Sequence, residues 1–401
     1  NTTGSNNSAF GYRALYRNTT GASNAAFGLE ALGSNTTGAS NAAFGFKALN
    51  KNTTGAANAA FGSETLYSNT TGRRNSAFGI QSLYSNTTGS FNTATGYESL
   101  FFNTTGSYNT ATGLRALYSN TAGRFNSAFG YNSLYSNTTG ERNSSFGYQS
   151  LFSNTTGLYN NAFGYQSMDY NTSGEANNAF GFATLELNTT GSGSTAFGHS
   201  AMYGNTTGTG NTGLGYGTLG GANSNSHTGN YNIAIGYMAA AGHNSGDKNV
   251  FIGHNAGYND SYKNSSNKLV IANSNTTTPL IDGDFSASTL KVNGSLAVTG
   301  SMTMSVASTI TSSSTYNGTE TIIPVNGEGI TVTIDSDQVI AGRILIIKNL
   351  VENNGFNLET EGNAQIQVAS QALASSVTLS SYYAVTLFCD GTNWYDLNKS
   401  D

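Results

Sequence analysis

The sequence predicts an all-β protein whose first half is a β-solenoid with a 17-residue period. A four-residue NTTG-type motif begins 13 consecutive repeats, from Asn1 to Asn205, without any insertion. Glycine occupies positions 4 and 11 of every repeat, where a coil that turns a corner needs positive φ or close backbone approach. Two glycines in each 17-residue unit leave no apolar 3.6-residue period, so an amphipathic helix is excluded.

Two positions of the repeat carry large apolar side chains. Position 10 is Phe in ten copies, and position 15 is Leu in eleven. Stacking of identical turns at about 4.8 Å would place Phe on Phe and Leu on Leu, so we expect both to form a core ladder. Its first members are Phe10, Phe27, Phe44, Phe61, Phe78, Leu15, Leu32, Leu49, Leu66 and Leu83. Because this core is thin, we expect neighbouring chains to help fill it.

The recurrent Asn and Thr residues predict a second set of columns. Identical amide and hydroxyl side chains on successive turns can hydrogen-bond along the stack. The NTT triplet also matches the acceptor pattern for N-glycosylation, although the backbone-capping geometry of Asn at a turn explains its recurrence sufficiently.

The composition excludes several function classes. Charged residues make up 9% of the 401 residues and the formal net charge is -5, with no Lys or Arg block to neutralise a phosphate backbone. Nucleic acid is therefore not an expected partner. Cys389 is the only cysteine, which excludes an intrachain disulfide and a multi-cysteine metal site. The apolar runs, such as 344–347, are too short to cross a bilayer, and no membrane insertion is expected.

After residue 221 the period loosens, and residues 222–272 contain the segments NIAIG (232–236) and NVFIG (249–253). This pattern resembles the head repeats of trimeric autotransporter adhesins, and the preceding NTTG units are similar to repeats of phage tail fibres. The resemblance implies a trimeric β-roll assembled from three chains. The chain opens at the first residue of a repeat, which suggests a processed product or part of a longer fibre.

Two further regions follow. Residues 273–315 are predicted to form a narrow triple-stranded β neck and a linker, because six residues separate the starts of LKVNGS, LAVTGS and MTMSVA from Leu290 onward. Residues 316–401 are predicted to form a small antiparallel β-sandwich-like tip domain with strands near 321–325, 330–334, 344–347, 365–368, 377–379 and 384–388. The closing VTLFCDGTNWYDL (385–397) resembles the last hairpin of tail-fibre tip domains.

The candidate ligand-binding residues are Asn393, Trp394 and Tyr395, beside a DGTN turn. Trp394 and Tyr395 could form an aromatic platform for a sugar ring. Alternatively, Trp394 packs in the core of the domain. Asp282 and Asp284 flank Gly283 and favour a turn over a cation site. The four histidines lack metal-ligand spacing, so no metal and no cofactor is expected.

From the repeats and the resemblance we expect a homotrimeric extracellular fibre, on a virion, an injection particle or a cell surface. The N-terminal end would join a particle or an upstream fibre segment, and the C-terminal tip would bind a surface receptor or glycan. Catalysis is not expected, because the scattered carboxylates have no fixed partner spacing. The alternatives are an ice- or mineral-binding Thr array and a purely structural filament.

Overall fold

The computed structural model describes residues 2–220 and 227–296, and the segments 314–316, 322–325, 331–334, 344–349, 356–360, 366–367, 375–379, 384–389 and 392–396. The chain divides into two compact units, Asn1–Ser295 and Leu296–Asp401. Both are built from β-strands, and within the described residues helix is confined to one 3-10 turn, η1 (Asp260–Tyr262).

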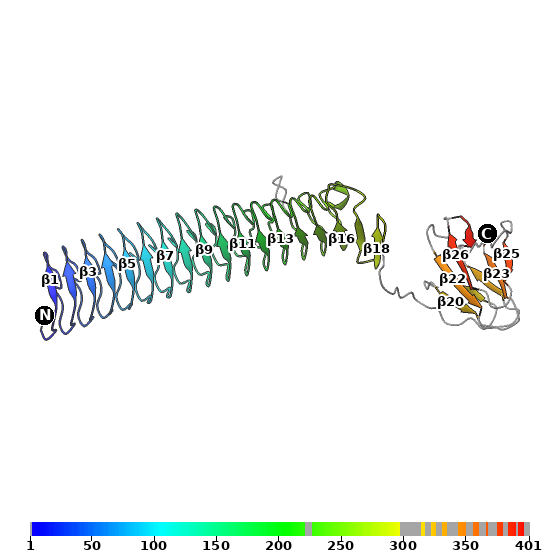
Figure 1. The fold of residues 1–401 in the computed structure, drawn as a ribbon. Coiled ribbons are helices and arrows are strands. Elements are labelled where there is room, and N and C mark those ends of the chain that lie inside the picture. The colour runs from blue at the N-terminus through cyan, green and yellow to red at the C-terminus, as the bar shows by residue number, and fades with distance from the viewer. Residues whose placement is uncertain are drawn as a thin grey trace. The chain divides into compact units, whose positions relative to one another are not determined.

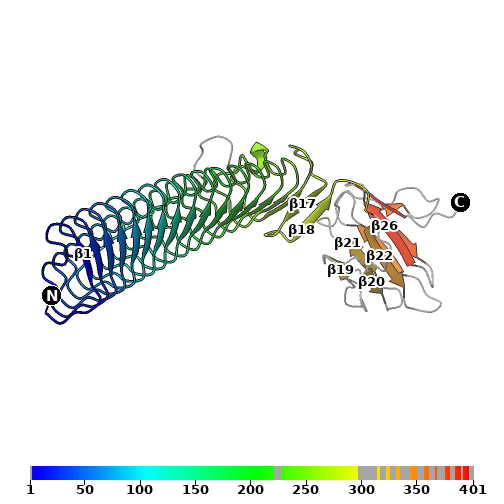
Figure 2. The same cartoon turned by 60° about the vertical axis from the view of Figure 1, so that its left-hand side comes forward.

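The first unit is a β-solenoid of about 15 turns, which confirms the predicted fold and its 17-residue period (Figure 1). Each turn contributes one three-residue strand, and successive strands pair in parallel, so that Phe27 pairs with Phe44. Figure 2 shows these strands stacked side by side along the solenoid. They are β1 (Ser8–Phe10), β2 (Ala25–Phe27), β3 (Ala42–Phe44), β4 (Ala59–Phe61), β5 (Ser76–Phe78), β6 (Thr93–Thr95), β7 (Thr110–Thr112), β8 (Ser127–Phe129), β9 (Ser144–Phe146), β10 (Asn161–Phe163), β11 (Asn178–Phe180), β12 (Thr195–Phe197), β13 (Thr212–Leu214), β14 (Ile233–Ile235) and β15 (Val250–Ile252).

The two invariant glycines meet the two requirements of a corner: one allows a positive φ, and the other allows close approach of two backbone segments. Gly28, at position 11, has φ +137°, which L side chains rarely adopt. Gly21, at position 4, is needed for close approach instead: a Cβ there would lie 2.3 Å from the Gly38 carbonyl oxygen and 2.5 Å from Asn18 Oδ1. Both corners therefore exclude any side chain.

The core lies inside a single chain and is formed by position 15 and by the Ala at position 9. Leu32, Leu49, Leu66 and Leu83 are fully buried, as are the Ala residues in the middle of the strands, and Leu15 is 7% exposed in the first turn. Each turn is therefore closed by its own backbone and filled by Leu on Ala, without side chains from another chain.

The predicted Phe ladder is a column, but it lies outside this core. Phe27, Phe61 and Phe78 are 36–43% exposed, Phe44 is half-buried, and Phe10 in the first turn is 75% exposed. The reason is the two-residue alternation of a strand: because Ala at position 9 points inward, Phe at position 10 must point outward.

The last turns close the C-terminal end of the solenoid core. Phe251 replaces the inward Ala and is fully buried, and Gly257 replaces the inward Leu of the same turn. A Cβ on Gly257 would lie 2.1 Å from Phe251 Cδ1, so the large residue requires the small one. The ring of Tyr262, from η1, packs edge-on against Phe251 with the ring centroids 6.1 Å apart. Together these residues cover the end of the core.

A hairpin extends the sheet beyond the covered end of the core. The strand β16 (Lys268–Ile271) pairs in parallel with β15, whereas β17 (Ile281–Asp284) and β18 (Thr289–Val292) are antiparallel. Residues 290–292, which open the six-residue repeats of the predicted neck and linker (273–315), therefore pair within the chain. Of that predicted region, 297–313 lies outside the described residues.

The second unit contains two small sheets (Figure 1). One has the order β19 (Ser314–Tyr316), β21 (Thr331–Ile334), β23 (Phe356–Thr360) and β25 (Ser376–Leu379). The other has the order β20 (Ile322–Val325), β22 (Ile344–Asn349), β26 (Ala384–Cys389), β27 (Trp394–Asp396) and β24 (Ile366–Gln367). The predicted strands match β20, β21, β22, β24, β25 and β26, whereas β19 begins inside the predicted linker.

The sheets of this unit are mixed and not purely antiparallel as predicted. Strands β19, β21 and β23 are parallel neighbours, and so are β20 and β22, while β22–β26 and β26–β27 are antiparallel. From β19 to β25, successive strands alternate between the two sheets. Sheet neighbours are then separated by a strand of the other sheet, which permits them to run in the same direction.

Candidate functional site

Two buried columns of Asn hold successive turns together, and they confirm the predicted amide ladder. At position 1, Asn35 Nδ2 donates to Asn18 Oδ1 at 2.8 Å and to the Gly38 carbonyl at 2.9 Å. At position 7, the backbone N–H of Asn41 donates to Asn24 Oδ1 at 3.0 Å. Because both hydrogen atoms of the position 1 amide are engaged and the side chain is buried, these Asn residues have no room for a glycan in the folded solenoid.

The Thr at position 2 forms a ladder to the backbone. Thr36 Oγ1 donates to the Thr53 carbonyl at 3.0 Å, and the same contact recurs from turn to turn. The second Thr of the motif, for example Thr37 or Thr54, is exposed. In these motifs it is therefore the second Thr that presents its side chain to the surroundings.

Three long aromatic columns run along the outside of the solenoid, besides a shorter stack at position 6. The Phe column at position 10 stacks ring on ring, with the centroids of Phe27 and Phe44 4.8 Å apart and their planes 6° apart. A column at position 16 stacks Tyr67, Tyr84, Phe101, Tyr118, Tyr135 and Phe152. A column at position 12 stacks Tyr131, Tyr148, Tyr165, Phe182, His199, Tyr216, Tyr237 and His254.

Stacking determines what these columns can contact. A sugar ring binds an aromatic side chain on its flat face, but inside each stack both faces of a ring are covered by the rings of the neighbouring turns. The stacks present ring edges in apolar strips. Such a strip suits packing against another protein surface better than it suits binding of a sugar.

The carboxylates Asp169 and Glu186 replace aromatic rings at position 16 on consecutive turns. Burial raises the pKa of Asp169 to about 6, against the opposing effect of the hydrogen bond from Gln166. Burial, and then the charge of Asp169, raises the pKa of Glu186. Neither carboxylate is paired with a cation in the contacts of the described residues, so this pair is a weak point of the column at neutral pH.

Two of the four histidines lie inside the solenoid and two lie outside. His199 and His254 belong to the position 12 column. His227 and His243 are fully buried and continue the Asn column at position 1: His227 Nδ1 lies 3.2 Å from Asn205 Oδ1, and His243 Nδ1 lies 3.3 Å from His227 Nε2. Burial, and then His243, lowers the pKa of His227 to about 3, and burial lowers the pKa of His243.

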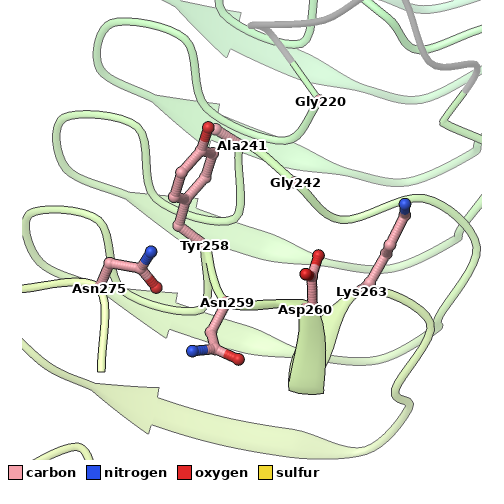
Figure 3. A pocket seen from close by; sticks show the side chains of 8 residues that line it. All are labelled: Gly220, Ala241, Gly242, Tyr258, Asn259, Asp260, Lys263 and Asn275. Atoms are coloured by element: carbon pink, nitrogen blue, oxygen red, sulfur yellow. The ribbon is translucent and has the colours of Figure 1, made fainter. Parts of the chain in front are cut away.

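A polar pocket of about 370 Å³ lies near the C-terminal end of the solenoid (Figure 3). It exists because Gly220 and Ala241 occupy position 16 in the two turns before Tyr258, so the aromatic column lacks rings there. Figure 3 shows the Tyr258 ring extending toward Ala241, with Asp260 and Lys263 nearby. The remaining lining residues are Gly242, Asn259 and Asn275. These amide, carboxylate and ammonium groups can hydrogen-bond a hydroxylated ligand.

The three residues predicted to bind a ligand at the tip differ in how deeply they are buried. Trp394 is fully buried on β27, opposite Cys389 of β26, which favours its role as a core residue. Asn393 and Tyr395 are half-buried. A binding surface at this hairpin would therefore use Asn393 and Tyr395 without the indole.

The acidic residues of the hairpin serve a structural role. Lys268 Nζ donates to Asp284 Oδ2, and Asp284 Oδ1 accepts from the backbone N–H groups of Ser286 and Ala287. The Lys268 ammonium and these donors hold the pKa of Asp284 well below its usual range. In the described residues no group of three or more His, Cys, Asp or Glu side chains could hold a metal ion, and no helix could span a membrane.

The fold and its columns define the chain as a β-solenoid repeat protein. No protein-family model matches it, and searches of curated proteins and of solved structures returned no match.

Proposed function

We propose that this chain forms a homotrimeric extracellular fibre, in which the solenoid is a rigid stalk and the C-terminal unit attaches to a target surface. One observation carries the proposal: about 15 in-register turns bury their own Leu and Ala while a strip of aromatic side chains stays exposed along the outside. A single chain satisfies its backbone and core, so the exposed strip is available for neighbouring copies of the chain.

The exposed strip is unusual for a lone protein in water. Monomeric soluble proteins rarely expose long contiguous apolar patches, and larger patches mark interaction surfaces. The Phe column continues as Leu214, Ile235 and Ile252, so its apolar character extends to the last turn. Three such strips facing a common axis would bury each other and stiffen the stalk.

The attachment role rests on the second unit and on the resemblance of its last hairpin to tail-fibre tips. Three copies held on one stalk would act together, so avidity would exceed the affinity of a single tip. We propose binding at the tip and not catalysis. The receptor class in this proposal is a surface protein or glycan contacted by Asn393 and Tyr395.

Two measurements test the proposal. Mass photometry of the intact protein should give three times the chain mass of 41.6 kDa. Removal of residues 316–401 should abolish binding to target cells. A monomer at working concentration would refute the trimer, and undiminished attachment by the truncated protein would refute the adhesive tip.

An ice- or mineral-binding function has one supporting observation, the exposed Thr at position 3 of successive turns. The Thr at position 2 donates its hydroxyl to the backbone, so the array is a single file. Thermal hysteresis of the purified protein would favour this alternative. A purely structural filament would show neither hysteresis nor surface binding.

A further inference from the structure

In most turns, the two ends of the outward strand face do not both carry a ring. Position 6 precedes the strand, and position 10 ends it with the Phe column. Where position 10 is Phe, position 6 is usually small or polar, as in Ser23 with Phe27 or Ala57 with Phe61. In turns 6 and 7 the sizes are reversed, with Phe91 and Tyr108 at position 6 and Thr95 and Thr112 at position 10. Only turns 8 and 10, among the 13 regular turns, carry rings at both positions.

The reversal forms a ridge and a notch at the same height of the solenoid. The ridge is the stack of Phe91, Tyr108 and Phe125, with ring centroids 4.8 and 5.0 Å apart. Guanidinium groups close both ends, with Arg74 lying 5.2 Å from the Phe91 ring and Arg142 lying 5.4 Å from the Phe125 ring. The three rings are 40–50% exposed, so the ridge stands out from the surface.

The notch interrupts the Phe column. Thr95 and Thr112 separate Phe78 from Phe129, which leaves a gap of about 14 Å between those two ring planes at a strand spacing of about 4.8 Å. The stack therefore ends at Phe78 and begins again at Phe129, where one face of each ring has no stacking partner in the aromatic contacts of the described residues. The notch is wide enough for two rings.

Within one chain the two columns lie on different segments of the turn. Position 6 is at a bend with left-handed φ, +59° in Phe91, whereas position 10 ends a strand. In turn 8, where both positions carry rings, no contact between Phe125 and Phe129 is among the aromatic contacts of the described residues. In the core, by contrast, the large Phe251 and the small Gly257 touch, and their sizes are matched by contact. A match of sizes without contact in the chain indicates contact between chains.

We propose that two rings of the ridge, Phe91 and Tyr108, insert into the notch of the next copy at the same height. This inference rests on the proposed homotrimer and specifies its interface. The position 6 edge of each strand face meets the position 10 edge of its neighbour, and three such head-to-tail contacts close a ring. The ridge and notch then hold the three solenoids parallel and prevent them from sliding by one turn.

The test fills the notch while leaving the single chain intact. In the variant Thr95→Phe/Thr112→Phe, the new rings continue the stack from Phe78 to Phe129, so the solenoid should keep its circular dichroism spectrum. The protein concentration at which half of the trimer has dissociated should rise at least about tenfold, because overpacking an interface is costly. Adding Phe91→Ser/Tyr108→Ser, residues of the kind found in turns 2 and 3, should restore assembly.

A cross-linking experiment tests the register directly. In a Cys389→Ala background, Tyr108→Cys/Thr112→Cys should give covalent trimers on oxidation, since the two cysteines are too far apart to bridge within one chain. The pair Tyr108→Cys/Phe180→Cys, four turns out of register, should remain uncross-linked. An unweakened trimer in the notch-filled variant, or equal cross-linking of both pairs, overturns the interface and leaves the trimer standing. A monomeric wild-type protein overturns both.

Discussion

Asn103 and Asn120, one turn apart, are joined by a 2.7 Å hydrogen bond from Asn120 Nδ2 to Asn103 Oδ1. Asn103 in turn donates to Asn86 Oδ1 at 2.7 Å and to the Gly106 carbonyl at 3.0 Å. Every buried amide of this column is thus both donor and acceptor. The column runs from turn to turn without a gap until His227 takes over from Asn205.

We predict that Asn103→Ala lowers the free energy of unfolding by about 3 kcal/mol, because the buried Asn86 Oδ1 loses its donor from this column and one N–H of the buried Asn120 amide loses its acceptor. Far-UV circular dichroism during urea unfolding measures the effect. Thr105→Ala, at the exposed Thr of the same corner, should change it by less than about 0.5 kcal/mol. Equal effects of the two variants would contradict a structural role for the amide column.

Because the Leu column lies inside the solenoid and the Phe column lies outside it, substitutions of Leu117 and Phe61 should differ in their effect on stability. Leu117→Ala should destabilise the solenoid by about 2–5 kcal/mol, since it opens a cavity in a fully buried column. Phe61→Ala removes a ring that is 36% exposed and should cost about 1 kcal/mol in the dissociated chain. The single tryptophan, Trp394, lies in the other unit, so its fluorescence serves as an internal control.

Replacing a glycine by alanine should destabilise the solenoid by an amount that depends on the position of the glycine in the repeat. Gly113 has φ +133°, and a Cβ there would lie 2.4 Å from the Gly130 carbonyl oxygen. Gly113→Ala should therefore cost more than about 3 kcal/mol. Gly193→Ala, at position 6 with φ +67° and with the Gly210 backbone N 4.0 Å from the added Cβ, should cost about 1 kcal/mol. Thermal unfolding of both variants measures this difference, and equal losses of stability would contradict close approach of the two backbones at Gly113.

The buried carboxylate of Asp169 predicts a gain of stability on neutralisation. Its pKa is raised to about 6 in the folded chain, so the folded state loses stability as pH rises from about 4 to about 6. Asp169→Asn should therefore stabilise the solenoid by about 1–2 kcal/mol at pH 8 and leave it unchanged near pH 3.5. Glu175→Gln, at an exposed carboxylate, is the control. The same gain at both pH values would exclude burial as the cause.

The buried His227 predicts the opposite pH dependence. Its pKa is lowered to about 3, so the unfolded state binds the proton more readily, and stability falls as pH falls from about 6.5 toward 3. Asp247, the one acidic group acting on both histidines, opposes this effect. His227→Asn should reduce the loss between pH 7.5 and pH 4 by about 2–3 kcal/mol. His199→Asn, at an exposed histidine of the position 12 stack, is the control.

The sequence by itself determined the period, the parallel stacking of turns, the two glycine corners, the Leu column and the Asn ladder. These features depend on residues that recur at fixed spacing, and any stack of identical turns must place such residues in register. Gly21 and Gly28 illustrate this, since each is required by the neighbouring turn as well as by its own.

Only the tertiary structure decided which side of the chain each column occupies. Ala26 and Phe27 are adjacent, and hydrophobicity alone favours burying the larger one. The strand pleat nevertheless turns Ala26 inward, because Leu32, at φ +50°, already fills the interior. The irregular spacing after residue 221 likewise concealed that His227 and His243 continue the Asn column. Side-chain direction depends on backbone angles at the corners, and those angles are set by the hydrogen bonds between turns.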